Sequence, residues 1–196
     1  FTPRMNPDVN GYWMCDIGRF DYHWIEGDDR LHLPLVRDEN GAPVPVSWHE
    51  LFAKLRDRLT GRLAASGSAN PDGVRFLLSA HASHEEFFLF RRLVNELVGD
   101  VHAIAVGWRH RPKPQPDGVK FKVPPVDAPN VNGARLHGLV GGAVPDPVGE
   151  ADLSALKDAV GAGRVSALYV FDPGPEGTIG DTAWILEARR QGTLPL

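Results

Sequence analysis

Cysteine is almost missing from this sequence, since Cys15 is the single one among 196 residues. One thiol cannot form an internal disulfide, and the chain by itself cannot assemble an all-cysteine zinc or iron–sulfur site. Cys15 is therefore either incidental or one ligand of a site whose other ligands lie elsewhere.

Long apolar runs and an excess of positive charge are missing as well. No stretch approaches 18 consecutive apolar residues, and the N-terminus lacks the basic, apolar and small-residue order of a signal peptide. We therefore expect no direct membrane insertion and a cytoplasmic location. The formal net charge of −4 also argues against a nucleic-acid partner.

Glycine and proline are abundant instead: 21 and 17 residues, about 19% of the chain against about 12% in average usage. With 42% hydrophobic residues the chain is still globular, with one sizeable core or two small ones. Eight prolines and seven glycines fall between residues 107 and 149. We expect this stretch to be an extended surface arm outside the core.

The apolar patterning predicts an α/β fold with a parallel sheet. Apolar runs at 74–79, 101–106 and 165–171 are typical of buried strands, and helical spacing predicts the helices between and after them. Capping boxes at Ser47–Glu50 and Ser83–Glu86 predict two helix starts. Asn40-Gly41 between short apolar alternations predicts a hairpin. The expected domains are a loop-rich, β-containing segment, 1–46, and an incomplete α/β domain, 47–196. The last helices are expected at 152–160 and 181–191.

Cys15 lies in an aromatic segment, between Trp13 and the pair Gly18-Arg19. A thiol packed on aromatic rings is one interpretation, because free cysteine is among the most buried residue types. The other is a single thiolate ligand of a metal site, where Gly18 would allow close approach of the backbone and Arg19 would favour the anionic thiolate.

The pattern Asn-x-x-Val-Asn-x-x-Trp-x-Cys-Asp-x-Gly-Arg-Phe, residues 6–20, resembles a segment of the molybdopterin-oxidoreductase-like proteins. It is most similar to that of the large subunit of bacterial NADH:quinone oxidoreductase (complex I). The resemblance continues through Val46–Leu51 and Ser79–Glu86. From residue 107 on, only the order of elements matches. The chain, which opens on Phe1 and ends at Leu196 without terminal tails, is thus expected to be an internal fragment.

This resemblance implies that Cys15 is the fourth ligand of a [4Fe–4S] cluster whose other three cysteines lie before Phe1, with Trp13, Gly18 and Arg19 around the cluster. It implies other peripheral-arm subunits as partners and a place on the inner face of the cell membrane through the complex. No residue of the fragment is expected to be catalytic. A cluster-free structural paralogue is a further alternative.

One departure separates two branches of the resemblance. Formate dehydrogenases and nitrate reductases usually read Cys-x-Lys-Gly-Arg, whereas this chain has Ile17 at the lysine position. An apolar side chain offers no cationic donor between a cluster and a pterin. We therefore expect no bound molybdopterin, and keep a molybdenum or tungsten oxidoreductase of the formate dehydrogenase type as the alternative.

Three weaker patterns complete the candidates. The loops Ser79–Ser83 and Asp172–Gly177 follow predicted strands, where an open sheet binds nucleotides, but ordinary turns are the favoured interpretation. His81 and His84 lack a completing cluster for zinc. The basic, proline-rich stretch 109–116, with Lys120 and Lys122, is either an arm that docks on an acidic partner or a solvated loop.

Overall fold

The computed structural model describes residues 2–8, 11–66, 73–118, 120, 123–143, 149–172 and 178–195, without the side chains of 17, 24 and 62–66. The chain forms two compact units, Phe1–Leu55 and Arg56–Leu196. The division falls inside helix α2 (Trp48–Ser66), whereas the sequence-based boundary at 46/47 lies just before that helix. Each unit is described by itself below.

The first unit consists of short elements. It holds helix α1 (Asp16–Phe20), the 3₁₀ turn η1 (His23–Glu26) and the antiparallel strands β1 (Leu35–Arg37) and β2 (Pro43–Pro45). The hairpin predicted around Asn40-Gly41 is confirmed, with its first strand beginning at Leu35. Asp38 closes the turn, because its Oδ1 accepts hydrogen bonds from the amides of Asn40 and Ala42, at 2.9 and 2.8 Å.

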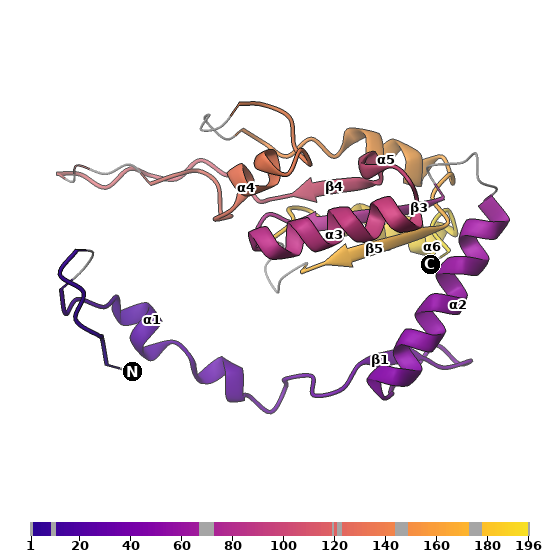
Figure 1. Ribbon diagram of the computed structural model, residues 1–196, viewed down its shortest axis with the longest axis horizontal. Coiled ribbons are helices and arrows are strands. Elements are labelled where there is room, and N and C mark those ends of the chain that lie inside the picture. Colours follow the sequence, from indigo (N-terminus) through magenta and orange to yellow (C-terminus); the bar gives the residue numbers. More distant parts are fainter. Residues whose placement is uncertain are drawn as a thin grey trace. The chain divides into compact units, whose positions relative to one another are not determined.

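The second unit is built on three parallel strands in the order β4-β3-β5, which confirms the predicted α/β fold with a parallel sheet (Figure 1). The strands are β3 (Val74–Ser79), β4 (Ile104–Gly107) and β5 (Ala167–Phe171). The strand predicted from residue 101 begins three residues later. Residues 101–103 form the 3₁₀ turn η2 (Val101–Ala103), because the Asp100 side chain caps it by accepting from the His102 amide at 2.9 Å.

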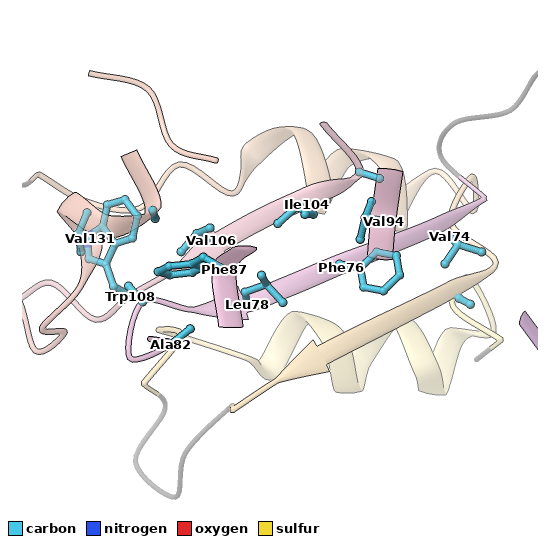
Figure 2. Packing of buried hydrophobic residues seen from close by; sticks show 14 residues of the cluster. Val74, Phe76, Leu78, Ala82, Phe87, Val94, Ile104, Val106, Trp108 and Val131 are labelled. Atoms are coloured by element: carbon cyan, nitrogen blue, oxygen red, sulfur yellow. The ribbon is translucent and has the colours of Figure 1, made fainter. Parts of the chain in front are cut away.

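Helices cover both faces of this sheet, and alternate side chains of β3 supply the two cores. Phe76 and Leu78 belong to the cluster with Phe87 and Val94 of α3 (His84–Leu97), shown in Figure 2. Leu77 belongs to the other cluster, with residues of α5 (Ser154–Gly161) and α6 (Ala183–Gln191). Central β3, with Val74 and residues 76–79 all buried, therefore joins the two layers.

The expectation that 107–149 lies outside the core is wrong in part. Trp108, Val131 and Ala134 are buried in the first cluster, and 131–136 forms helix α4 (Val131–Leu136). The reason is a pair of contacts between residues far apart in the sequence. Asn130 fixes the start of α4, because its amide donates to the Ala80 carbonyl at 3.0 Å and its Nδ2 to the Ala82 carbonyl at 2.8 Å. These contacts outweigh the poor helix propensity of glycine inside α4.

Candidate functional site

The thiol of Cys15 is exposed and directly precedes α1. The carbonyl of Cys15 accepts the backbone N–H of Arg19 at 3.0 Å, which closes the first helical turn. Just before it, Asn6 and Gly11 pair through reciprocal backbone hydrogen bonds of 2.9 and 2.7 Å. Cys15 thus lies between a tight turn and a short helix, and it is not the thiol packed on aromatic rings that one interpretation expected.

Of the predicted neighbours of Cys15, Trp13 and Gly18 are exposed and Arg19 is half-buried. Trp13 is 80% exposed, and the Arg19 guanidinium lies 5.0 Å from the centre of the Phe20 ring. A Cβ atom added at Gly18 would meet no atom within 4 Å. Glycine is therefore not required at position 18 by contacts within the described part of the chain, and its expected role toward a cluster stays a prediction.

These residues fit one corner of an iron–sulfur cluster. A [4Fe–4S] cluster takes four cysteine thiolates, and this sequence has one accessible thiol to offer. Arg19 lies one turn along α1 from Cys15, and its guanidinium contacts the Phe20 ring. The donor set is thus suited to contribute a single ligand. Among the described residues, no group of three or more His, Cys, Asp or Glu side chains could hold a metal ion.

The backbone amides of the loop after β3 are already engaged in hydrogen bonds. The N–H groups of residues 80–82 donate to the Gly107 carbonyl, the Ser79 Oγ and the Ser79 carbonyl, at 3.0 to 3.1 Å. The N–H of Ser83 donates to Glu86 Oε2 at 2.7 Å. A phosphate at Ser79–Ser83 would need these donors, so the geometry supports the ordinary strand-to-helix turn.

Hydroxyl groups connect the end of β3 with the residues on either side of the loop after β5. Buried Ser79 Oγ lies 3.3 Å from Thr178 Oγ1, which donates to the Asp172 carbonyl at 2.7 Å. Asp172 has φ of 50°, which is rare for a non-glycine residue. Of the predicted loop Asp172–Gly177, residues 173–177 lie outside the described residues.

A cleft of about 520 Å³ opens beside the end of β4. Ile179, which lines the cleft, approaches the end of β4 closely: a Cβ at Gly107 would lie 2.7 Å from the Ile179 carbonyl oxygen. The cleft is lined by both signs of charge, from Arg109, Glu150, Lys157 and Asp181. This mixed charge favours neither an anionic nor a cationic ligand.

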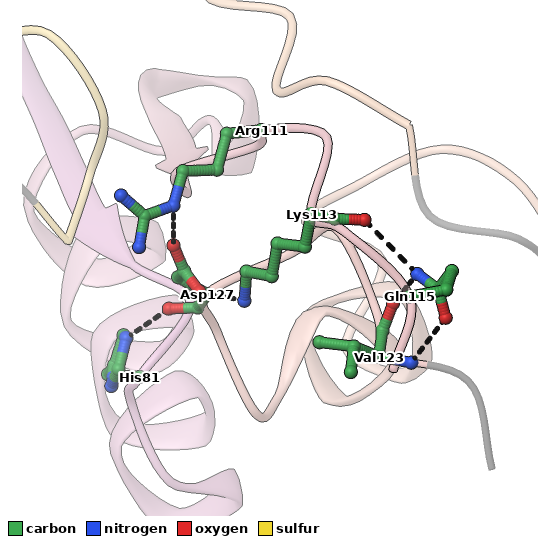
Figure 3. A network of polar contacts seen from close by, with 6 residues as sticks. All are labelled: His81, Arg111, Lys113, Gln115, Val123 and Asp127. Atoms are coloured by element: carbon green, nitrogen blue, oxygen red, sulfur yellow. Dashed lines mark hydrogen bonds and ion pairs between the residues drawn. The ribbon is translucent and has the colours of Figure 1, made fainter. Parts of the chain in front are cut away.

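The basic stretch after β4 is anchored at its root. Residues 109–111 run antiparallel to 125–127, with a bridge between His110 and Val126. Figure 3 shows both carboxylate oxygens of Asp127 engaged, one by Lys113 and the other by Arg111 Nε at 3.3 Å. The Lys113 hydrogen bond holds the pKa of Asp127 below its ordinary value, with further contributions from the charges of Lys113, Arg111 and Arg109.

This arm continues outward from Asp127. The Gln115 side chain bridges its two segments, by donating to the Val123 carbonyl at 3.0 Å and accepting from the Val123 amide at 2.9 Å. Lys120 is exposed, while Lys122 lies outside the described residues. Arg111 and Lys113 form ion pairs with Asp127, which belongs to the same arm. These two side chains are therefore not simply basic groups of a solvated loop.

The sequence did not predict that His84 lies against His137. His81 and His84 do not share a site: His81 Nε2 lies 2.6 Å from the Asp127 carbonyl oxygen, whereas His84 faces His137. No sequence signal links His84 to His137, because 53 residues separate them.

In the described segments, no helix is long and apolar enough to cross a membrane.

Known proteins resemble about half of this chain. A Thermus thermophilus protein named NADH-quinone oxidoreductase subunit 3 is 36% identical over 94 residues, which cover 48% of this chain and 11% of that protein. A Staphylococcus aureus protein, provisionally named as a formate dehydrogenase, is 32% identical over 97 residues, 50% of this chain and 10% of that protein. No family model matches the chain.

The chain is a partial homologue of proteins named as oxidoreductases. It spans about a tenth of the length of these curated relatives. The two names differ in the reaction, and the two identities, 36% and 32%, are close. Sequence identity therefore does not distinguish between the two names.

Proposed function

We propose that this chain is an electron-transfer and scaffolding part of an NADH:quinone oxidoreductase, within the large subunit of the peripheral arm. The observation that carries the proposal is Cys15, an exposed thiol at the start of α1 inside the Trp-x-Cys-Asp-x-Gly-Arg-Phe pattern. Similarity to the Thermus thermophilus protein named for that activity supports it.

In this proposal Cys15 supplies one of four thiolates to a [4Fe–4S] cluster, and residues before Phe1 supply the other three. The cluster, when bound, accepts and releases one electron at a time. The chain's own part is to hold the Cys15 sulfur at the start of α1, where a backbone hydrogen bond closes the first helical turn. Arg19 is a nearby cation, and Trp13 and Gly18 belong to the surroundings that tune a cluster. No residue of this chain moves a proton or attacks a substrate.

The α/β unit is proposed to act as a scaffold. In the loop after β3, the backbone amides of residues 80–83 already donate hydrogen bonds within the chain. In addition, Ile17 replaces the lysine expected between cluster and pterin. Both observations support a domain that keeps the fold without molybdenum chemistry. The partners are other peripheral-arm subunits, which place the chain on the inner face of the cell membrane.

A formate dehydrogenase type of oxidoreductase is the second candidate, because a relative provisionally named for that activity matches half of the chain. The candidate is the molybdenum- or tungsten-dependent type of this enzyme, whereas the first proposal needs neither metal. Elemental analysis of the purified parent polypeptide therefore separates the two. One molybdenum or tungsten atom per chain would favour the second candidate.

The same preparation tests the cluster ligand. We expect Cys15→Ser to remove the cluster or convert it to one with less iron, because serine offers no thiolate. Iron content and low-temperature paramagnetic resonance measure the change. The matched control is Met14→Leu, which keeps an apolar side chain beside the cysteine. Iron content and a spectrum that are unchanged in Cys15→Ser would contradict the assignment and leave a cluster-free structural protein.

A further inference from the structure

Two imidazoles from separate helices face each other on the α/β unit. His84 is the first residue of α3, and His137 follows the last residue of α4. His84 Nδ1 lies 3.4 Å from His137 Nε2, and the ring centres are 5.5 Å apart. His84 is exposed and His137 is half-buried, so solvent reaches the pair.

This separation matches two ligands of one metal ion. Zinc binds histidine nitrogen at about 2.0–2.1 Å in tetrahedral geometry, which places two such nitrogens about 3.3 Å apart. A direct hydrogen bond between the rings would be long, since N–H donors usually lie about 2.7–3.2 Å from their acceptors. The observed 3.4 Å separation of the two nitrogens therefore matches that of two ligands on one metal ion.

The backbone under both histidines is well supported. Ser83 and Glu86 form a complete capping box at the start of α3, and the His137 amide donates to the Gly133 carbonyl at 3.0 Å. The Phe87 ring, fully buried, lies 6.2 Å from the His137 ring and provides an apolar wall. Because α3 and α4 contribute to one core, packing sets the backbone positions of the two histidines relative to each other.

His81 is close in sequence but does not complete a set of three. Its Nε2 lies against the Asp127 carbonyl oxygen, which engages that nitrogen as a donor. The described residues offer no third protein ligand to the pair. Water would therefore fill the remaining positions, as in open metal sites.

We propose that His84 and His137 bind one divalent transition-metal ion of the class that prefers imidazole ligands: zinc, nickel or copper. The ion would link the N-terminus of α3 to the C-terminus of α4 and so hold both helices against the sheet. This site is separate from Cys15 and from the iron–sulfur proposal. Its affinity should follow the general order for these ions, with copper binding more tightly than nickel or zinc.

Calorimetric titration of the full 196-residue chain with zinc chloride tests the site. Cys15→Ser serves as the background, because a free thiol also binds zinc. We expect one saturable binding step per chain in this background. His84→Gln and His137→Gln should each abolish the step, while His102→Gln, which alters another exposed histidine, should preserve it. Zinc should also raise the unfolding temperature of the background and of His102→Gln alone.

Paramagnetic resonance of the copper-loaded chain provides an independent count. Coupling to two nitrogens is expected in the background, and this two-nitrogen signal should be lost in either single variant. Equal zinc binding in the background and both variants would overturn the proposal. So would loss of the step in His102→Gln, since that result would mean diffuse binding by surface histidines.

Discussion

Asp127 organises more of the α/β unit than any residue that sequence reasoning singled out. Its carboxylate holds Lys113 and Arg111, its amide donates to the Arg109 carbonyl at 3.0 Å, and its carbonyl lies against His81. One residue therefore ties the arm to the loop after β3. The signal for this role was weak, because an acidic residue among prolines also suits a solvated turn.

The ion pairs of Asp127 should survive mild acid. Because the folded-state pKa lies below the ordinary aspartate value, Asp127 stabilises the fold above about pH 3.9, and this stabilisation is lost as the pH falls through the lowered pKa. Carboxyl carbon NMR during an acid titration measures it. Lys113→Met should raise the pKa toward the ordinary value, whereas Lys120→Met, at the exposed part of the arm, should not. Equal pKa values in both variants would contradict the assignment.

At the scale of elements, the start of α3 offers the most direct test of how a helix cap stabilises the α/β unit. The Ser83 side chain accepts the Glu86 amide at 3.2 Å, and Glu86 accepts the Ser83 amide at 2.7 Å. The capping box satisfies two of the donors that a helix leaves open. It thereby fixes the loop that crosses from β3 to α3.

We expect Ser83→Ala to lower the free energy of unfolding of the α/β unit by about 1 kcal/mol, because a helix loses its N-cap. Chemical denaturation monitored by circular dichroism measures the change. Ser47→Ala is the matched control: Ser47 and Glu50 form the same reciprocal contacts, but in the unit Phe1–Leu55. An equal loss in both variants would show that the cap of α3 has no special role in the sheet unit.

Elements with a local signal were predictable, and the others were not. Periodicity and capping boxes placed α2, α3, α5 and α6, and the apolar runs placed the three parallel strands. Helix α4 was missed because it has six residues and its stability comes from tertiary contacts of Asn130 and Val131. Propensity alone cannot reveal such a helix. The pairing of His84 with His137 was missed for the same reason.

At the scale of the whole molecule, burial is unevenly distributed. None of the described residues from 2 to 55 is buried, and large apolar side chains there remain open to solvent. The unit Arg56–Leu196 holds both hydrophobic clusters. Local stability follows buried apolar contact, so the two units should open at different free energies. The exposed position of Cys15 belongs to this pattern.

Hydrogen exchange should show the contrast directly. Amides of β3, paired on both sides by β4 and β5, should exchange most slowly in the 196-residue chain, and amides of residues 11–45 should exchange fastest. Mass spectrometry of peptides after timed exchange measures both. Slow exchange throughout residues 11–45 would contradict the expectation that the first unit lacks a stable core of its own.

For the candidate cluster site, the sequence could predict Cys15 and its neighbours in the chain, but not the geometry around a cluster. The aromatic segment singled out Cys15, and the structure adds that its thiol is accessible and that α1 begins next to it. Geometry around a cluster could not follow from this sequence, because three of the four ligands are expected before Phe1. The loop Ser79–Ser83 after β3 was predictable from the sequence. The sequence favoured an ordinary turn there, and the hydrogen bonds of its amides account for that turn.

The two faces of the sheet carry separate optical probes. Trp108 is buried in the cluster under α3 and α4, with its indole N–H donating to the Gly149 carbonyl at 2.8 Å. Trp184 packs against the cluster under α5 and α6, and its indole N–H donates to the Asp181 carbonyl at 2.9 Å. Fluorescence from each indole therefore reports on one layer, and phenylalanine replacements of the other tryptophans would let the loosening of each layer be followed in real time.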